Sequence, residues 1–359
     1  MNLSPSSDPT STLLAVIQDP SLAALAANSP EWWEQVKREA HHHGLSAVLA
    51  TLCGEYLPAD QKAWQRGVVA THLASHNRLL RELKTIVSAL DAEGIRSVVL
   101  KGPVLGERYL DPPFLKISGD LDILVDEANL QRACRCLEQS GLNEERHASP
   151  WWAWKRIAHH VTFTPSSQLK EGASVDLHFR LFWHHKPISG RDLLDRSELW
   201  SGARGLQVRV LNPVDEAIYL ANHATRHFFV RLAWLYDALM VFRKLSMVER
   251  KQVLALARKA GKITVLSAAN RTALEFFHEP LLADLPDFPD WQEFRRESSQ
   301  VIEINDGMLW REKWHQRVLL RKLSLQLAGS PRDLLGLAEK HFIGPAIVLG
   351  NSLVQRIRS

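Results

Sequence analysis

Two aspartates share one face of a short, strand-like segment. In the stretch GDLDILV, side-chain alternation along a strand puts Asp120 and Asp122 on one side. The other side carries Leu121, Ile123 and Val125, which read as core. Carboxylates about 6–7 Å apart along a strand repel each other. A hard divalent cation removes that repulsion, so the pair predicts a metal site that suits Mg²⁺, with Mn²⁺ as the alternative.

A third carboxylate stands in a later segment of the same kind. In SVDLHFRLF, the residues Asp176, His178 and Arg180 alternate with apolar residues and therefore share a face of the predicted strand. If this strand lies beside the first, Asp176 joins the aspartate pair. Three carboxylates can hold two metal ions about 4 Å apart, which is the arrangement used for in-line phosphoryl displacement.

A turn that favours anions precedes these aspartates. The stretch LKGP lies where a predicted strand over 96–101 ends and a short helix over 103–110 begins. Gly102 allows close approach of the backbone to a ligand, and a helix N-terminus favours anions. Lys101 adds a positive charge suited to phosphate. The chain contains neither GxxxxGK[ST] nor GxGxxG, so neither of those phosphate-binding loops is expected.

A polar group of side chains follows the last predicted strand, in NHATRHFFVRLAWLYD. His223 and His227 have the i, i+4 spacing of zinc ligands, but no glutamate follows His223 as in HExxH and no third ligand is evident. Packing and lining of a ligand cleft are therefore the two readings that remain. Because buried polar groups need partners, we expect His223 and Asp237 to face the aspartates across a cleft and to contact nucleotide or acceptor.

The order of elements predicts an α+β fold. Residues 11–92 have helical periodicity, residues 96–211 contain five predicted strands, and helices return from residue 212. We therefore expect a small mixed β-sheet flanked by helical regions at both ends. The predicted divisions are an N-terminal helical region over 1–94, an α/β core over 95–212 and a C-terminal helical domain over 213–359.

The motifs in this order resemble a known family. LKGPVLGERYLDPP, GDLDILV, VDLHFRLFW and NHATRHFFVRLAWLYD are similar to the uncharacterised nucleotidyltransferases, a branch of the polymerase-β-like superfamily. The resemblance implies a nucleotidyltransferase core that binds an NTP and two Mg²⁺ ions. It implies metal-binding and catalytic roles for Asp120, Asp122 and Asp176. It also implies nucleotide contacts, which fall on Lys101, Gly102, Lys116, His178, His223 and Asp237. Lys116 stands where family members often carry arginine.

Composition limits the alternatives. The formal net charge of +4 over 359 residues is compatible with nucleotides but is too small to indicate nucleic acid by itself. No apolar run reaches the roughly 18 residues of a membrane span, and the N-terminus lacks the pattern of a signal peptide. The three dispersed cysteines predict no disulfide framework, which favours a cytoplasmic protein.

Three functional hypotheses remain open at this point. The first is transfer of a nucleoside monophosphate from an NTP to a hydroxyl of a small molecule or peptide natural product. The second is an RNA- or tRNA-directed transferase acting as a toxin, for which the basic segments 243–251 and 310–322 would supply a groove. Solvated helix faces are the favoured explanation of both segments. The third is a nucleotide-binding protein without catalysis, which three unneutralised carboxylates would disfavour.

Overall fold

A seven-stranded mixed sheet forms the centre of the protein. The computed structural model describes residues 9–116, 118–145, 158–166, 172–181, 190–202, 205–300, 319–320 and 322–328. The strand order is β3-β4-β5-β2-β1-β7-β6. The strands are β1 (Ser97–Val99), β2 (Asp120–Val125), β3 (Leu142–Glu144), β4 (His160–Pro165), β5 (Ser174–His178), β6 (Glu198–Ser201) and β7 (Gln207–Val210).

The pairing of the central strands sets the register of the aspartates. Strands β2 and β5 are parallel, and Asp122 lies opposite Asp176. Strand β1 is antiparallel to β2 and parallel to β7. Strand β4 is antiparallel to β5, with His160 opposite His178 and Thr162 opposite Asp176. The polar residues of three neighbouring strands therefore come together on one face of the sheet, because side chains at paired positions point to the same side.

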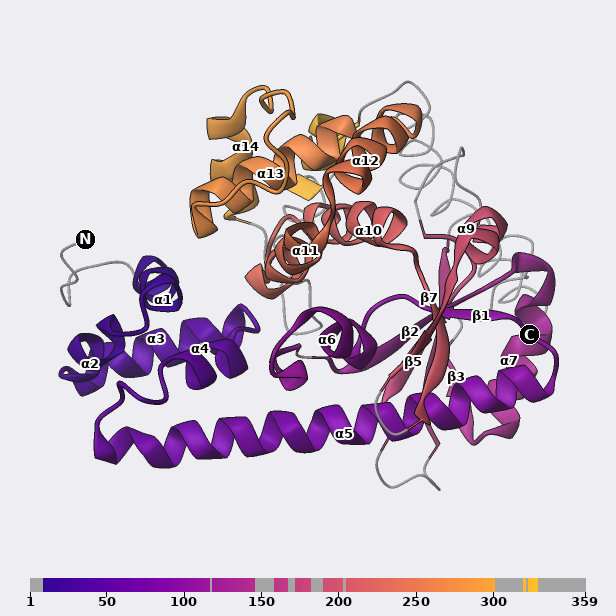
Figure 1. Cartoon of the computed structure of the whole chain (residues 1–359), viewed down its shortest axis with the longest axis horizontal. Helices are drawn as coiled ribbons and strands as arrows, with labels where there is room; N and C mark the ends of the chain where they lie inside the picture. Colours follow the sequence, from indigo (N-terminus) through magenta and orange to yellow (C-terminus); the bar gives the residue numbers. More distant parts are fainter. Residues whose placement is uncertain are drawn as a thin grey trace, which may run out of the picture.

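One face of the sheet is closed by two helices. The long helix α5 (Lys62–Ala92) presents Leu79, Leu83, Ile86 and Leu90 at helical spacing, and α7 (Leu130–Gln139) lies next to it. These helices share an apolar cluster with the odd-numbered face of β2, which carries Leu121, Ile123 and Val125. Figure 1 shows α5 running beneath the N-terminal helices and on to the sheet. Apolar packing covers this face of the sheet, so we expect a ligand site on the opposite face.

The opposite face is covered by helices from three parts of the chain. They are α6 (Pro103–Tyr109), α9 (Gly190–Arg196), α10 (Pro213–Arg226) and α11 (Leu232–Lys244). Leu124, which shares a face with Asp122, packs into this second apolar cluster. The same cluster includes residues of α1 (Pro9–Gln18), α2 (Leu22–Ala27), α3 (Pro30–His42), α4 (Ser46–Leu52), α12 (Met247–Lys259), α13 (Ile263–Phe277) and α14 (Trp291–Ser298). The N- and C-terminal helices thus pack around one core (Figure 1).

The predicted α+β class is confirmed, but two strands were missed. The sheet has seven strands where the sequence predicts five, because β3 and β6 went unrecognised. Each has four residues or fewer and lies at an edge of the sheet, where most side chains are partly or fully exposed. Such strands lack the apolar alternation that marks a half-buried strand. The three cysteines are free and buried, in line with the expectation of no disulfide.

None of the helices in the described ranges is long and apolar enough to cross a membrane.

A glycine in α6 brings the loop before β2 against this helix. A Cβ built on Gly106 would lie 2.2 Å from the carbonyl oxygen of Pro113 and 3.1 Å from Cβ of Lys116. Pro113 belongs to the short 3₁₀ helix η2 (Pro113–Leu115), which leads directly to Lys116. The absence of a side chain at Gly106 therefore lets the loop lie close enough to place Lys116 over the sheet.

We predict that Gly106→Ala lowers the free energy of unfolding by about 1–3 kcal/mol, the range for overpacking against groups that cannot easily move. The matched control is Gly67→Ala in α5, where an added Cβ meets nothing within 4 Å. Alanine in that helix interior should stabilise the protein by about 0.5–1 kcal/mol. Urea unfolding followed by circular dichroism measures both, and equal effects of the two substitutions would contradict the close packing.

Candidate active site

A polar cavity of about 570 Å³ lies between the aspartate face of the sheet and helices α10 and α11. Its floor comes from β2, β4 and β5, and its wall comes from the two helices. The lining includes Lys101, Lys116, Gly119, Asp120, Asp122, His159, His160, Thr162, Asp176, His178, Tyr219, Asn222, His223, Arg226, His227, Arg231 and Trp234. The cavity therefore gathers most of the side chains that the sequence singled out.

Asp122 is the central carboxylate and is almost fully buried, with 2% of its surface exposed. Lys101 Nζ lies 3.0 Å from Oδ2, and His178 Nε2 lies 2.9 Å from Oδ1. Burial by itself would raise the pKa of Asp122, but the Lys101 charge and the His178 hydrogen bond outweigh it and hold the pKa below its usual range. The carboxylate is thus ionised and neutralised by protein groups.

The strand-to-helix corner after β1 places Lys101. The amide of Leu100 donates to the carbonyl of Asp122 at 3.0 Å, which locks the end of β1 to β2. Gly102 then adopts φ +77°, a conformation that other residues rarely take, and Pro103 starts α6. Burial lowers the pKa of Lys101, but the neighbouring Asp122 more than offsets this and keeps the ammonium charged. Lys101 therefore contacts Asp122 directly, whereas the sequence suggests only a contact with phosphate.

The other two aspartates are more accessible. Asp176 accepts a hydrogen bond from Thr162 Oγ1 at 2.7 Å, and His160 Nε2 lies 3.8 Å from the same carboxylate. Asp120 is the first residue of β2 and lines the cavity. Burial, together with the charges of Asp122 and Asp176, raises the pKa of Asp120. This crowding of negative charge is the electrostatic signature expected of a site that holds a cation.

The donor set fits a divalent metal ion. One ligand atom from each of Asp122, Asp176 and His178 lies within 4.8 Å of the other two. Carboxylate oxygens suit Mg²⁺ and Mn²⁺, and an imidazole nitrogen suits Mn²⁺ better than Mg²⁺. Asp120 lines the same cavity but does not belong to this tight group. The residues present could therefore hold one cation between β2 and β5, with Asp120 beside it.

Lys116 and Asp237 form a second buried ion pair at the edge of the cavity. Their Nζ and Oδ2 atoms are 2.9 Å apart, and both side chains are nearly inaccessible. Lys116 lines the cavity, whereas Asp237 is not among the lining residues and lies behind Lys116 on α11. Burial raises the pKa of Asp237 against the opposing charge of Lys116. Asp237 therefore acts on the cavity through its ion pair with Lys116 and not by lining it.

A family comparison agrees with this geometry. The family model described as uncharacterised nucleotidyltransferase matches residues 29–278, well over half of the 359-residue chain. The chain belongs to this family. The match supports nucleotidyl transfer as the general activity and includes every residue that lines the cavity. No curated protein matches the chain at a significant level.

One wall of the cavity is aromatic. His223, His227 and Trp234 have ring centroids 4.8–5.1 Å apart. A tight turn with positive φ at Phe228 and Phe229 folds α11 back against α10 and so brings the three rings together. Burial, followed by the charge of Lys101, lowers the pKa of His223 well below its ordinary value, and its Nε2 is buried without a hydrogen-bond partner among the described residues. His223 is thus a neutral group that can accept or donate one further hydrogen bond.

Several lining residues were not assigned from the sequence. Tyr219 lies one helical turn before His223, and Arg226 lies directly before His227. The helical repeat places both on the same side of α10 as His223, so it could have identified them from the sequence. His159 and His160 were left unassigned because no ligand spacing links them to another residue in sequence. Only the antiparallel pairing of β4 with β5 brings them to His178.

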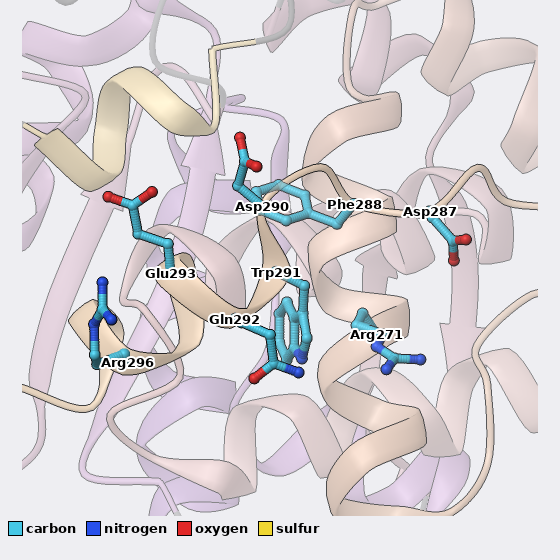
Figure 2. Close-up of a pocket in the computed structure, with 8 residues that line it drawn as sticks. All are labelled: Arg271, Asp287, Phe288, Asp290, Trp291, Gln292, Glu293 and Arg296. Carbon is cyan, nitrogen blue, oxygen red and sulfur yellow. The ribbon is translucent and has the colours of Figure 1, made fainter.

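A second cavity, of about 660 Å³, lies near α14 and away from the aspartates. Figure 2 shows Trp291 near its centre, with Glu293 and Arg296 on one side and Arg271 and Asp287 on the other. Trp291 Nε1 donates to Glu275 at 3.1 Å, so its polar atom is already used. The charged groups point in different directions and do not converge on one point, which makes this cavity the weaker candidate.

We predict that Lys101→Met lowers the free energy of unfolding by about 3–5 kcal/mol, because it leaves the buried Asp122 carboxylate without its main counter-charge. The double substitution Lys101→Met with Asp122→Asn should lose less than Lys101→Met alone. Lys84→Met, at an exposed position of α5, is the matched control and should change stability by no more than about 0.5 kcal/mol. Urea unfolding measures these three variants and the single variant Asp122→Asn, and additive effects of the two pocket substitutions would rule out the coupling.

We also predict a specific loss of stability in acid. The folded pKa of Asp122 lies below its unfolded value, so its contribution is fully present above about pH 4 and is lost as the pH falls further. The stability difference between the native chain and Asp122→Asn should therefore stay constant down to about pH 5 and shrink as the pH falls from about 4 to 2. Unfolding curves across that range measure it, and a constant difference would contradict the depressed pKa.

Proposed function

We propose that the protein transfers a nucleoside monophosphate from an NTP to a hydroxyl group of a small molecule or peptide natural product. The observation that carries the proposal is the register of Asp122 opposite Asp176 beneath a cavity, in a chain of the nucleotidyltransferase family. In-line displacement at an α-phosphate needs carboxylates on neighbouring strands that face one solvent-accessible space. The cavity has that form.

The proposed cofactor is Mg²⁺, or Mn²⁺, held as two ions. Asp122 and Asp176 would hold the first ion, with His178 hydrogen-bonded behind Asp122, and Asp120 would contribute to the second. Bound metal would supply charge neutralisation at the phosphates and lower the pKa of the acceptor hydroxyl. Asp176 is partly exposed, like Asp120, and lies opposite Asp122 on the neighbouring strand, so it would be the group that takes the hydroxyl proton.

Cationic side chains around the cavity would bind the triphosphate. Lys116, Arg226 and Arg231 all line it. Asp237 would keep the Lys116 ammonium in place through their 2.9 Å contact. Lys101 would act mainly on Asp122, releasing it partly when a metal ion takes over the neutralising role. Gly102 would keep the backbone corner open, and His223 with Trp234 offers a flat surface against which a base or an acceptor could lie.

The RNA-directed alternative finds less support. In segment 243–251, Arg243 pairs with Glu279, and Arg250 donates to backbone carbonyls of Phe242, Leu245 and Leu281. These charges therefore hold the C-terminal helices together. Segment 310–322 lies largely outside the described residues. A purely nucleotide-binding role agrees with the neutralisation of Asp122 by protein groups, so activity rather than electrostatics must distinguish it from an enzyme.

We predict that Mg²⁺ together with an NTP raises the melting temperature of the protein more than either alone, and that Asp176→Asn abolishes the additional rise. Asp176 is the better choice for substitution than Asp122, because Asn can still accept from Thr162 and no buried lysine is left unpaired. A ligand at about 100 times its Kd stabilises by about 2.7 kcal/mol. Thermal melts with EDTA, Mg²⁺, the four NTPs and both together measure it.

Asp60→Asn, at an exposed position before α5, is the matched control and should behave as the native chain. Pyrophosphate release from the preferred NTP, in the presence of pooled hydroxyl compounds or of tRNA, then separates the three hypotheses. Asp176→Asn should lower the rate by about 100-fold or more, the scale for losing a group that stabilises transition-state charge. Combined stabilisation without any turnover would favour the non-catalytic role, and turnover only with tRNA would favour the RNA-directed one.

A further inference from the structure

Three histidines meet on the floor of the cavity, beside the proposed Mg²⁺ site. His159 directly precedes β4, His160 is the first residue of β4, and His178 is the last residue of β5. Their ring centroids are 4.3, 5.1 and 5.6 Å apart. One nitrogen from each ring lies within 4.8 Å of the other two. Nucleotidyl transfer as proposed above uses only His178, so the convergence of the other two rings needs its own explanation.

One of the three rings is oriented by a carboxylate, and a second lies near another carboxylate. His178 Nε2 lies 2.9 Å from Asp122, and His160 Nε2 lies 3.8 Å from Asp176. A histidine that binds a metal ion through one nitrogen usually donates its other N–H to a carboxylate, which fixes the tautomer and makes the free nitrogen a better ligand. With Nε2 of His178 donating to Asp122, Nδ1 of His178 is left as a lone pair.

The remaining nitrogens have the environment of metal ligands. His178 Nδ1 is buried and has no hydrogen-bond partner among the described residues. The side chain is only 8% exposed, so little solvent is available to replace that partner. His160 Nδ1 lies 3.0 Å from His159 Nε2. Zn–N bonds of about 2.0–2.1 Å in a tetrahedral site put neighbouring nitrogens about 3.3 Å apart. The two nitrogens are therefore already near the spacing at which a metal ion can replace the proton between them.

We propose that His159, His160 and His178 bind a transition-metal ion of the Zn²⁺ or Co²⁺ type, at a site separate from the carboxylate cation. Imidazole nitrogens select such ions over Mg²⁺. The assigned ligand atoms are His159 Nε2, His160 Nδ1 and His178 Nδ1, with a fourth position open to water or to a polar group of a bound molecule. Arg226 Nη2, which lies 3.4 Å from His159 Nε2, moves aside when the ion binds.

This site is linked to the carboxylate site through two contacts. Asp122 would ligate the hard cation and orient His178, and Asp176 would do the same for His160. The two sites share residues but differ in ligand chemistry. The inference does not depend on nucleotidyl transfer, because it rests on the three imidazoles and the carboxylates behind them.

The test uses the full chain without a histidine tag, stripped of metal by a chelator and titrated with Co²⁺ in excess Mg²⁺. Tetrahedral Co²⁺ bound to nitrogen absorbs strongly in the visible range, which reports the coordination directly. We expect one Co²⁺ per chain with that spectrum, displaced by Zn²⁺ and not displaced by Mg²⁺. His159→Asn should weaken binding by about 10-fold or more, the size of effect reported even for groups behind metal ligands.

A second ligand variant and two histidine controls make the result decisive. His160→Asn removes a half-exposed ligand, so it tests the same site if His159→Asn fails to fold. His227→Asn changes a cavity histidine outside the cluster, and His42→Asn changes the exposed tract at residues 41–43. Both controls should bind Co²⁺ as the native chain does. Absence of the tetrahedral spectrum, displacement of Co²⁺ by Mg²⁺, undiminished binding in both ligand variants, or loss in either control would overturn the proposal.

Discussion

The buried Asp122 carboxylate and its two cationic or hydrogen-bonding neighbours organise the site. A lone carboxylate at that depth would protonate or destabilise the fold. Lys101 comes from the end of β1 and His178 from the end of β5, so the strands on either side of β2 each supply one partner. The sheet can therefore assemble before any metal ion binds. This arrangement removes the electrostatic objection to a metal-free fold and leaves Asp120 and Asp176 free to attract a cation.

Asp122 lies between the two proposed metal sites and contacts protein groups on both sides. Asp122 faces Lys101 on one side and His178 on the other, and the His178 ring in turn faces the histidines of β4. A change of charge on one side of Asp122 is felt on the other through short, buried contacts, where screening by solvent is weak. The affinity of the carboxylate site for its ion and the affinity of the histidine site for its ion should therefore depend on each other.

Local patterns predicted the strand faces better than they predicted contacts between strands. The alternation in GDLDILV gave the two faces of β2, and the helical repeat from Leu79 to Leu90 gave the buried side of α5. The parallel pairing of Asp122 with Asp176 was stated only as a condition, because β3 and β4 intervene in the chain and no local pattern fixes which strands become neighbours. The pairs Lys116–Asp237 and Lys101–Asp122 depend on tertiary packing in the same way. Edge strands β3 and β6 were missed because they are short and most of their side chains are partly or fully exposed, so they carry little periodic signal.

The helices over the cavity are tied to the N-terminal part of the chain. The amide of Ala233 donates to the carbonyl of His43 at 3.0 Å, and His43 Nδ1 lies 3.2 Å from the carbonyl of Val230. Residues from α1 to α4 share one apolar cluster with α10 and α11. Swinging these helices away from the sheet would expose much of that cluster to water. We therefore expect α10 and α11 to stay in place when a molecule enters the cavity, so that side-chain rearrangement at the rim, rather than hinge motion of these helices, would limit how fast a bound molecule leaves.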